Sequence, residues 1–439
     1  MQVQIERLSG WGNYPVRNCK VLYPFAINNF EFFKGSIPRG MGRSYADQSL
    51  SDFVIKSGYL NRFLDFDEEN GILWVESGAT FEDILRYFLP RGWFPYITPG
   101  TKFVSIGGAI ASDVHGKNHH KEGSISNYVL GFNLIIPSGE RVYCTRDENA
   151  ELFYITLGGM GLTGFILDAK IKLRRVETSY ILYRSVRVKD LDHMLATFEE
   201  NDPKYTYSVA WIDCLSRGKN FGRGVVMFGE HAKLSDLPKD LKSNPLMFLG
   251  KTKINVPFYL PDFVLSDWTV KAFNQFYYLT HPDCWGVVDY ERFFYPLDSV
   301  LNWNRAYGKR GFVQFQFVVP DDAGLKEIFS DIVGFGGNSF LAVLKKMGKQ
   351  DGYLAFGMEG WTLALDFPIR GGLFEFLKAL TDKVIKFGGR VYLTKDAVLT
   401  KERFFDMYPN AKRWMEIRAK YDPQGLIYSD FSKRIGLTI

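Results

Sequence analysis

Two glycine-rich loops are the first feature of this sequence that could do chemistry. Residues 39–45 read RGMGRSY, and residues 99–110 read PGTKFVSIGGAI. Small residues leave backbone N–H groups uncovered, and such turns form concave sites that can bind a diphosphate. Either loop alone is more typical of a structural turn. Two such loops, each after a strand-like stretch, predict a diphosphate site between them.

A histidine cluster follows the second loop, at residues 113–120 (DVHGKNHH). His115, His119 and His120 are three of the six histidines in the chain. One interpretation is a metal site, because histidine is a common metal ligand. Gly116 interrupts any helical i, i+4 face, however, and no carboxylate or cysteine follows at a ligand-like spacing. The pattern favours a loop that orients a bound substrate or cofactor.

A third motif, GMGLTG at residues 159–164, matches the G-x-G-x-x-G spacing of dinucleotide-binding folds. That fingerprint requires a strand before the glycines and a helix after them. Here the order is reversed, because the helix-like ELFYITL precedes the motif and the strand-like GFILDAKIKL follows it. A Rossmann domain is therefore not expected.

Composition limits the class of protein. The chain has 439 residues, of which 46% are hydrophobic, 23% charged and 16% aromatic, as in soluble globular proteins of two domains. The net charge of +5 is scattered, without the basic run of a nucleic-acid-binding arm. We expect no nucleic acid partner and instead an anionic ligand or membrane surface. Four dispersed cysteines form no CxxC motif and indicate a reducing compartment.

The sequence carries no visible membrane-crossing or export signal. The N-terminal MQVQIERLSGWGNYP lacks a basic stretch followed by an apolar one, and no run of about 18 apolar residues occurs. We expect a cytoplasmic protein, or one attached peripherally to the cytoplasmic membrane. Residues 244–268 are apolar and dotted with lysine. They are interpreted either as a loop over a pocket or as a peripheral membrane contact.

The elements that must position these motifs change character along the chain. Residues 1–178 consist of short strands, turns and helices, including a hairpin at Asn70–Gly71 and a helix that begins after Thr80. Residues 179–390 contain longer alternating stretches such as YILYRSVRV, GFVQFQFVV and WTLALDF, with helices between them. Residues 391–439 return to helices. The pattern predicts an α+β fold with a large antiparallel sheet in the middle segment.

The motifs together resemble a known family. RGMGRSYAD, PGTKFVSIGGAIASDVHGKNHHKEGS, LGGMGLTGFI, WNRAYG, FVQFQFVVP and LTKDA are similar to the FAD-linked oxidases of the vanillyl-alcohol oxidase/p-cresol methylhydroxylase (PCMH) superfamily. Within it, HGKNHH and the late Lys-Asp pair resemble the branch of decaprenylphosphoryl-β-D-ribose 2′-oxidases, the oxidase subunits of epimerases. The resemblance implies a two-domain flavoprotein in which residues 1–178 and 391–439 form a split FAD-binding domain. Residues 179–390 would form the substrate-binding domain.

The resemblance also assigns roles to residues. Lys395 would lie over the flavin ring as the first candidate for the catalytic base, and His115 is the alternative. The implied cofactor-binding residues are Gly40, Met41, Gly42, Arg43, Ser44, Tyr45, Gly100, Thr101, Ser105, Gly107, Gly108, Ala109, Ser112, His115, Gly116, Asn118, Gly161, Gly164, Ile166 and Tyr392. The implied substrate-binding residues are Lys117, Trp211, Gln314, Gln316, Lys345, Ala364, Asp366 and Lys395.

Some positions depart from the family pattern. Covalent relatives place a histidine where this chain has Arg43, so FAD is expected to be held without a covalent bond. Ala364 replaces a cysteine beside the pocket, which predicts insensitivity to inhibitors that attack that thiol. Ala342 and Phe294 replace polar residues. These changes concern the choice of substrate more than the chemistry.

The implied activity is oxidation of a secondary sugar hydroxyl by hydride transfer to flavin N5. The resemblance points to the 2′-hydroxyl of a polyprenyl-phosphate pentose used in cell-wall polysaccharide synthesis, with an NADH-dependent reductase as partner. Three alternatives stay open. They are an alditol or aldonolactone oxidase of soluble sugars, a metal-dependent hydrolase built on the histidine cluster, and a flavin-binding protein without catalytic activity.

Overall fold

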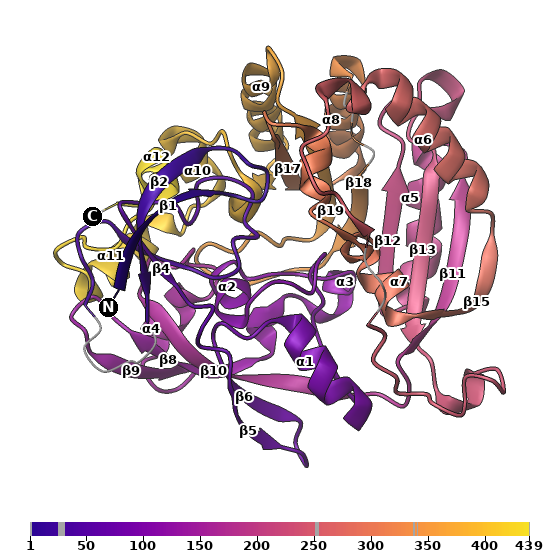
Figure 1. Cartoon of the computed structure of the whole chain (residues 1–439). Coiled ribbons are helices and arrows are strands. Elements are labelled where there is room, and N and C mark those ends of the chain that lie inside the picture. Colours follow the sequence, from indigo (N-terminus) through magenta and orange to yellow (C-terminus); the bar gives the residue numbers. More distant parts are fainter. Residues whose placement is uncertain (1, 25–30, 251–253, 337–338, 340, 439) are drawn as a thin grey trace.

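The computed structural model describes residues 2–24, 31–250, 254–336, 339 and 341–438. Its N-terminal part contains two sheets (Figure 1). The first has the strand order β1 (Gln2–Ser9), β2 (Val16–Tyr23), β4 (Phe53–Lys56), β3 (Ser36–Arg39). The second has the order β5 (Phe63–Asp67), β6 (Ile72–Glu76), β10 (Phe165–Arg175), β8 (Val129–Ile135), β9 (Arg141–Thr145), with β7 (Trp93–Pro95) paired to β10. Four short helices accompany them: α1 (Phe81–Phe88), α2 (Ile106–Ala111), α3 (His119–Glu122) and α4 (Ala150–Thr156).

Local sequence signals in this part are confirmed. Gly71 has φ of +64° in the turn that joins β5 to β6. Thr80 and Asp83 form a capping box at the start of α1, in which the Thr80 N–H donates to the Asp83 carboxylate at 2.9 Å. Helix α4 precedes the GMGLTG motif and strand β10 follows it. The motif is therefore a helix-to-strand turn and not a dinucleotide fingerprint.

The middle of the chain forms one antiparallel eight-stranded sheet, as expected. Its order is β15 (Cys284–Asp289), β11 (Tyr180–Val188), β13 (Gly224–His231), β12 (Tyr207–Ile212), β18 (Ala342–Met347), β19 (Gly360–Pro368), β17 (Phe312–Val319), β20 (Arg390–Val391). Its helices are α5 (Leu191–Asn201), α6 (Asp267–Thr280), α7 (Tyr290–Phe294), α8 (Asp322–Phe335) and α9 (Leu373–Lys386). A small parallel pair, β14 (Ile254–Asn255) with β16 (Val300–Leu301), lies beside it.

Strand β17 shows how this sheet separates core from site. All eight of its residues are buried. Because side chains alternate along a strand, Gln314 and Gln316 share one face while Phe315 and Phe317 share the other. The two phenylalanines belong to the main hydrophobic cluster together with Leu377 of α9. The two glutamines face the opposite way, into the cavity described below.

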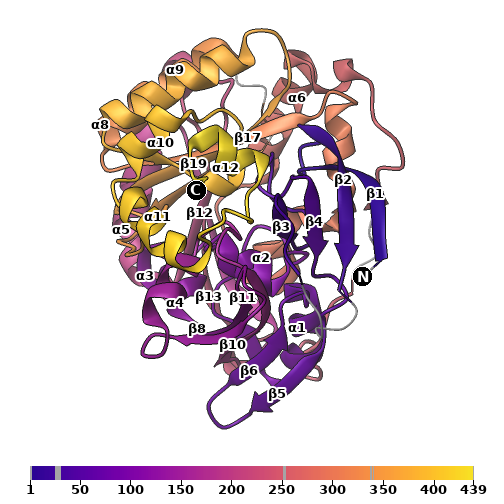
Figure 2. The ribbon, with the colours of Figure 1, turned by 90° about the vertical axis from the view of Figure 1, so that its left-hand side faces the viewer.

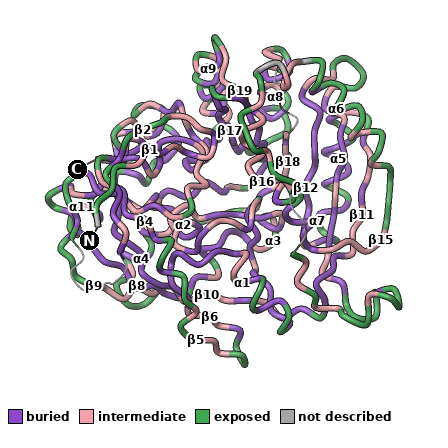
Figure 3. Tube along the Cα trace, viewed as in Figure 1, coloured by how far each residue is buried: buried purple, intermediate pink, exposed green. Residues whose placement is uncertain are grey.

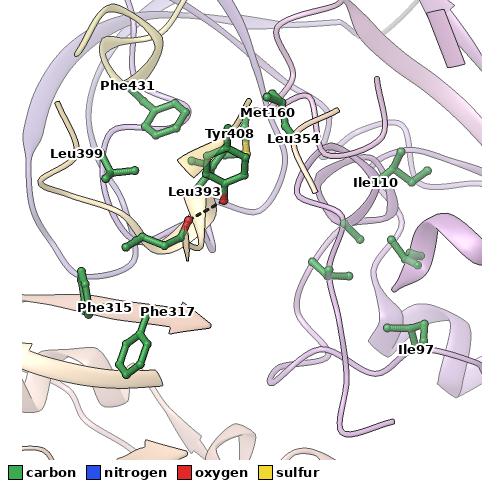
Figure 4. Packing of buried hydrophobic residues seen from close by; sticks show 14 of the residues in the cluster. Ile97, Ile110, Met160, Phe315, Phe317, Leu354, Leu393, Leu399, Tyr408 and Phe431 are labelled. Carbon is green, nitrogen blue, oxygen red and sulfur yellow. Dashed lines mark hydrogen bonds between the residues drawn. The ribbon is translucent and has the colours of Figure 1, made fainter. Parts of the chain in front are cut away.

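The C-terminal tail packs on the N-terminal part, as Figure 2 shows for α10 (Lys401–Met407), α11 (Ala411–Tyr421) and α12 (Asp430–Ile435). Ser36 and Ile427 form a parallel bridge. The Arg434 guanidinium contacts Asp47 and Asp396, each at 2.7 Å. Figure 4 shows buried side chains of the tail close to those of the N-terminal part, in a hydrophobic cluster that also includes β17. The described parts of the chain contain no helix both long and apolar enough to cross a bilayer.

Candidate active site

A cavity of about 950 Å³ lies between the two glycine-rich loops and the eight-stranded sheet. Most of the residues singled out in the sequence line it, including both loops, His115, both glutamines of β17 and three lysines. Ala109, Asn118 and Asp366 do not line it. Asn118 is fully buried and its side-chain amide donates to the Tyr96 carbonyl at 2.8 Å. The fold therefore gathers residues from positions 40 to 395 around one space.

The two glycine-rich loops face each other across one end of this cavity. A Cβ added to Gly40 would lie 2.1 Å from the Ser105 hydroxyl and 3.8 Å from Gly108 Cα. The hydroxyls of Ser77, Thr98 and Ser105 are buried without a hydrogen-bond partner. Buried polar groups are normally satisfied, so these hydroxyls are suited to a polar ligand. The narrow cradle and its unsatisfied donors fit the diphosphate of FAD.

Aromatic rings to which the sequence analysis gave no role hold the side chain of Arg43. Its guanidinium lies 3.9 Å from the ring centre of Trp11 and 5.5 Å from that of Phe103. Trp303 packs edge-on against Trp11 at 5.8 Å. All four residues line the cavity. No sequence motif joins residues 11, 43 and 303, so only their meeting in space identifies this group.

Hydrogen bonds on the sheet side fix the state of His115. The Gln316 side-chain nitrogen lies 3.0 Å from both His115 Nε2 and Thr362 Oγ1. The Thr362 hydroxyl donates to the Phe317 carbonyl, so it accepts from Gln316, and His115 Nε2 accepts the second amide hydrogen. Burial, aided by Lys345, holds the pKa of His115 well below its usual value. His115 is therefore neutral, with its Nε2 already occupied.

Three lysines converge on the same cavity: Lys117, Lys345 and Lys395. Burial lowers the pKa of Lys117 and of Lys345 to about 7, and that of Lys395 to about 8. The charges of Lys395 and Lys117 lower the pKa of Lys345 further. Lys345 Nζ is 3.5 Å from the Gly116 carbonyl. Such a group of poorly solvated cations favours an anionic ligand.

Asp366 lies behind the cavity wall and balances part of this charge. The Gln314 amide donates to Asp366 Oδ1 at 2.5 Å, and the Tyr307 hydroxyl donates to Oδ2 at 3.3 Å. Burial raises the pKa of Asp366 to about 7, while Gln314 and Lys395 act in the opposite direction. Asp366 thus orients Gln314 and supports the charge of Lys395. Its position does not bring it to the cavity surface.

A second aromatic group lines the cavity where β12 and α6 meet it, and this region is called the aromatic end. The ring centres of Trp211 and Tyr277 are 4.7 Å apart, and Tyr277 stacks on His281 at 3.9 Å. Phe294 and Ala364, two of the departures from the family pattern, also line the cavity, whereas Ala342 does not. Ala364 pairs with Gln316 across β17 and β19. Trp211 was singled out in the sequence, but Tyr277 and His281 were not, because α6 carries no motif.

The remaining histidines of the cluster have structural partners. His119 Nδ1 accepts the Gly348 N–H at 3.2 Å, and its Nε2 lies 3.0 Å from Gln350 Oε1. His120 Nε2 lies 3.3 Å from the Tyr205 carbonyl. Within the described ranges, no group of three His, Cys, Asp or Glu side chains is arranged to hold a metal ion. The hydrolase alternative therefore finds no support in these residues.

A buried ion pair ties the second glycine-rich loop to the middle segment. The Lys102 ammonium contacts the Glu291 carboxylate and lies 3.8 Å from Glu82. The Lys102 N–H donates to Asp298 at 2.8 Å. Both partners of the pair are buried, so the loss of Glu291 leaves the ammonium with only the longer contact to Glu82.

Glu291→Gln is expected to lower the free energy of unfolding by about 3 kcal/mol, because the buried Lys102 ammonium keeps only the longer contact to Glu82. Urea unfolding followed by tryptophan fluorescence measures the change. Glu199→Gln is the matched control, since Glu199 pairs with Lys346 at the surface, and it is expected to cost less than about 1 kcal/mol. Equal losses in both variants would contradict the role given to the buried pair.

Comparisons with known proteins agree with this site. A model of the FAD binding domain matches residues 35–145, which contain both glycine-rich loops and the histidine cluster. The chain is 38% identical to decaprenylphosphoryl-β-D-ribose oxidase of Mycolicibacterium smegmatis, over 98% of each chain. This chain belongs to that oxidase's family. It is an FAD-dependent oxidoreductase of the PCMH type, as the resemblance implied.

Other relatives are similar to the whole chain or only to part of it. An uncharacterised protein of Streptomyces coelicolor, named for its place in the mprA 5′ region, is 33% identical over 82% of this chain and all of its own length. Human Delta(24)-sterol reductase is 27% identical over only 31% of this chain. A D-arabinono-1,4-lactone oxidase model matches residues 369–435, which include Lys395. Neither of the two family models covers residues 146–368.

Proposed function

We propose that this oxidase removes hydrogen from the 2′-carbon of a polyprenyl-phosphate pentose, which converts the 2′-hydroxyl to a ketone. The observation that carries the proposal is the convergence of Lys117, Lys345 and Lys395 in one cavity that also contains the aromatic end. The lysines suit a phosphate, and the rings suit the first isoprene units. The name of the Mycolicibacterium smegmatis relative supports the same substrate class.

The proposed roles follow from the charges in the cavity. Oxidation of the alcohol requires loss of its O–H proton to a base and of its C–H hydride to an acceptor. FAD, when bound, supplies the hydride acceptor. Lys395 is the base in this proposal, because it lines the cavity at the position that the resemblance assigns to the flavin ring, and its pKa, lowered to about 8, leaves a minor neutral fraction near neutral pH. His115 is the weaker candidate, since its Nε2 already accepts from Gln316 and its pKa is held well below the usual value.

Gln316 and Gln314 orient the sugar in this scheme. Gln316 Oε1 and Gln314 Oε1 are buried without a hydrogen-bond partner, although both side-chain nitrogens are engaged. Each oxygen can therefore accept from a sugar hydroxyl inside the cavity. Lys117 and Lys345 bind the phosphate, and Trp211 packs on the hydrocarbon beyond it. A separate NADH-dependent reductase would then consume the keto product in the proposed epimerisation.

An aldonolactone oxidase is the second candidate, because the lactone-oxidase model matches the tail that carries Lys395. The test is anaerobic reduction of the bound flavin, followed by loss of its visible absorbance. We expect farnesyl-phosphoryl-β-D-ribose to reduce the flavin at least about 100-fold faster than D-arabinono-1,4-lactone at equal concentration. This ratio corresponds to a contribution of about 3 kcal/mol from the phosphate to transition-state binding. Faster reduction by the lactone would favour the second candidate. No reduction by any sugar would leave the non-catalytic alternative.

A further inference from the structure

Large apolar side chains that face solvent are concentrated in the segment that also forms the aromatic end of the cavity. The most exposed members of this segment are Ile254 (72%), Phe258 (63%), Trp268 (84%), Phe276 (66%) and Trp285 (63%). Exposed apolar residues that gather in this way usually mark an interaction surface. Residues 244–268, of which 251–253 lie outside the described residues, had two interpretations from the sequence, a loop over a pocket or a peripheral membrane contact. In the structure the exposed apolar residues continue along α6.

Helix α6 presents apolar residues on two sides. Val270 and Asn274 are buried on the inner side, and Tyr277 lines the cavity next to Trp211. Trp268, Phe276 and Leu279 are exposed, and their spacing places them together on the outer side. Trp285 of β15 is exposed as well, but it pairs with Arg184, whose side chain bonds Asn201 of α5, so it lies on the other face of the sheet. We call Trp268, Phe276 and Leu279 the α6 face.

Helix α6 lies at the side of the molecule away from β1, as Figures 1 and 3 show. None of the three side chains of the α6 face is charged. A helix with an exposed face of Trp, Phe and Leu suits the interfacial layer of a bilayer, where aromatic and aliphatic side chains enter the headgroup boundary. The outer apolar face and the inner wall of the cavity are thus opposite sides of the same helix.

We propose that the α6 face docks on a lipid bilayer and brings the aromatic end of the cavity to its surface. This inference rests on the proposed function, because a polyprenyl-phosphate substrate resides in a bilayer while its sugar must reach Lys395. Docking through α6 lets the hydrocarbon chain leave the cavity past Tyr277 without crossing open water. Apolar burial drives this contact, so binding does not require anionic lipid and is not released by salt.

Flotation of the FAD-loaded protein with phosphatidylcholine vesicles tests the proposal. The wild type is expected to float with the vesicles at low and high salt, and Trp268→Glu/Phe276→Glu is expected to reduce the bound fraction at least 10-fold. Val3→Glu/Ile5→Glu is the matched control, because these two residues are equally apolar and exposed on β1. It should float like the wild type.

Several outcomes would overturn the proposal. A wild type that stays at the bottom of the gradient, or an α6 variant that floats unchanged, rules out docking by this face. Release of the wild type by salt shows an electrostatic contact instead. If light scattering shows a dimer that the α6 variant dissociates, the face is covered by a second copy of the chain.

A second measurement separates this proposal from the proposed function. Reduction of the flavin by dissolved farnesyl-phosphoryl-β-D-ribose should be equal in the wild type and the α6 variant, whereas a long-chain substrate embedded in vesicles should react more slowly with the variant. Unchanged reduction by both forms of substrate contradicts docking. A wild type that floats but is not reduced by either form contradicts the proposed function and leaves docking intact.

Discussion

Lys395→Ala is expected to keep FAD bound while it slows flavin reduction by substrate about 10²–10⁴-fold, the usual contribution of a general base. The reason is that Lys395 lines the cavity and burial lowers its pKa to about 8, whereas His115 Nε2 already accepts a hydrogen bond and the pKa of His115 is held well below its usual value. Anaerobic rapid mixing measures the rate, and the visible flavin spectrum reports the bound cofactor. Unaltered reduction by this variant would end the assignment.

Lys395→Arg and Lys345→Ala refine that experiment. Arginine keeps the positive charge but is not deprotonated in proteins, so Lys395→Arg stays inactive if Lys395 is the base. An active Lys395→Arg would instead make the charge itself the important feature. Lys345→Ala should raise KM with little change in kcat, because the proposal gives Lys345 a role in binding the phosphate.

The same assignment has a pH signature with a definite sign. The pKa of Lys395 is lowered to about 8, so its neutral form increases as pH rises, and the reduction rate at saturating substrate should rise and level off above about 8. Lys117 and Lys345, with pKa values lowered to about 7, lose charge over the same range. Affinity for the anionic substrate should therefore fall as pH rises. The increase of the reduction rate with pH should be absent in Lys395→Ala.

Gly40→Val is expected to weaken FAD binding by at least about 100-fold, equivalent to about 3 kcal/mol. Its Cβ would lie 2.1 Å from the Ser105 hydroxyl, and even if that hydroxyl turns away, the branched side chain fills the gap between the two glycine-rich loops. Titration of the apoprotein with FAD, followed by flavin fluorescence, measures the affinity.

Gly58→Val is the matched control for this variant. Gly58 is exposed, and a Cβ added there meets nothing within 4 Å. It should bind FAD like the wild type. Normal FAD affinity in Gly40→Val would show that the diphosphate does not lie between the loops. The melting temperatures of both apoproteins show whether each variant is folded. We expect these temperatures to agree within a few degrees.

A backbone hydrogen bond joins the first glycine-rich loop, which contains Gly40, to the segment that carries Lys395. The Tyr45 N–H, at the end of the first glycine-rich loop, donates to the Thr394 carbonyl at 3.2 Å. Lys395 follows directly, and its ammonium lies 5.7 Å from the Tyr45 ring centre. The loop that cradles the cofactor and the proposed base are thus held together, although 350 positions separate Tyr45 from Lys395 in the sequence.

The sequence by itself determined the features that depend on neighbours along the chain. The Asn70–Gly71 turn, the Thr80 capping box, the order of α4 and β10, and the alternation of β17 were all predicted, because each arises from steric and hydrogen-bonding preferences within a few residues. The two glycine-rich loops were found for the same reason. Their small residues leave the backbone N–H groups accessible, and small residues can be recognised directly in the sequence.

Only the tertiary structure determined the protonation states of the site residues. The neutral state of His115 depends on burial and on Lys345, while Gln316 occupies its Nε2. The pKa of Lys395 depends on burial and on Asp366 behind the cavity wall. These partners come from strands whose pairing and register bring distant segments side by side. A pKa is set by desolvation and by charges near in space, and neither quantity can be read from the order of residues.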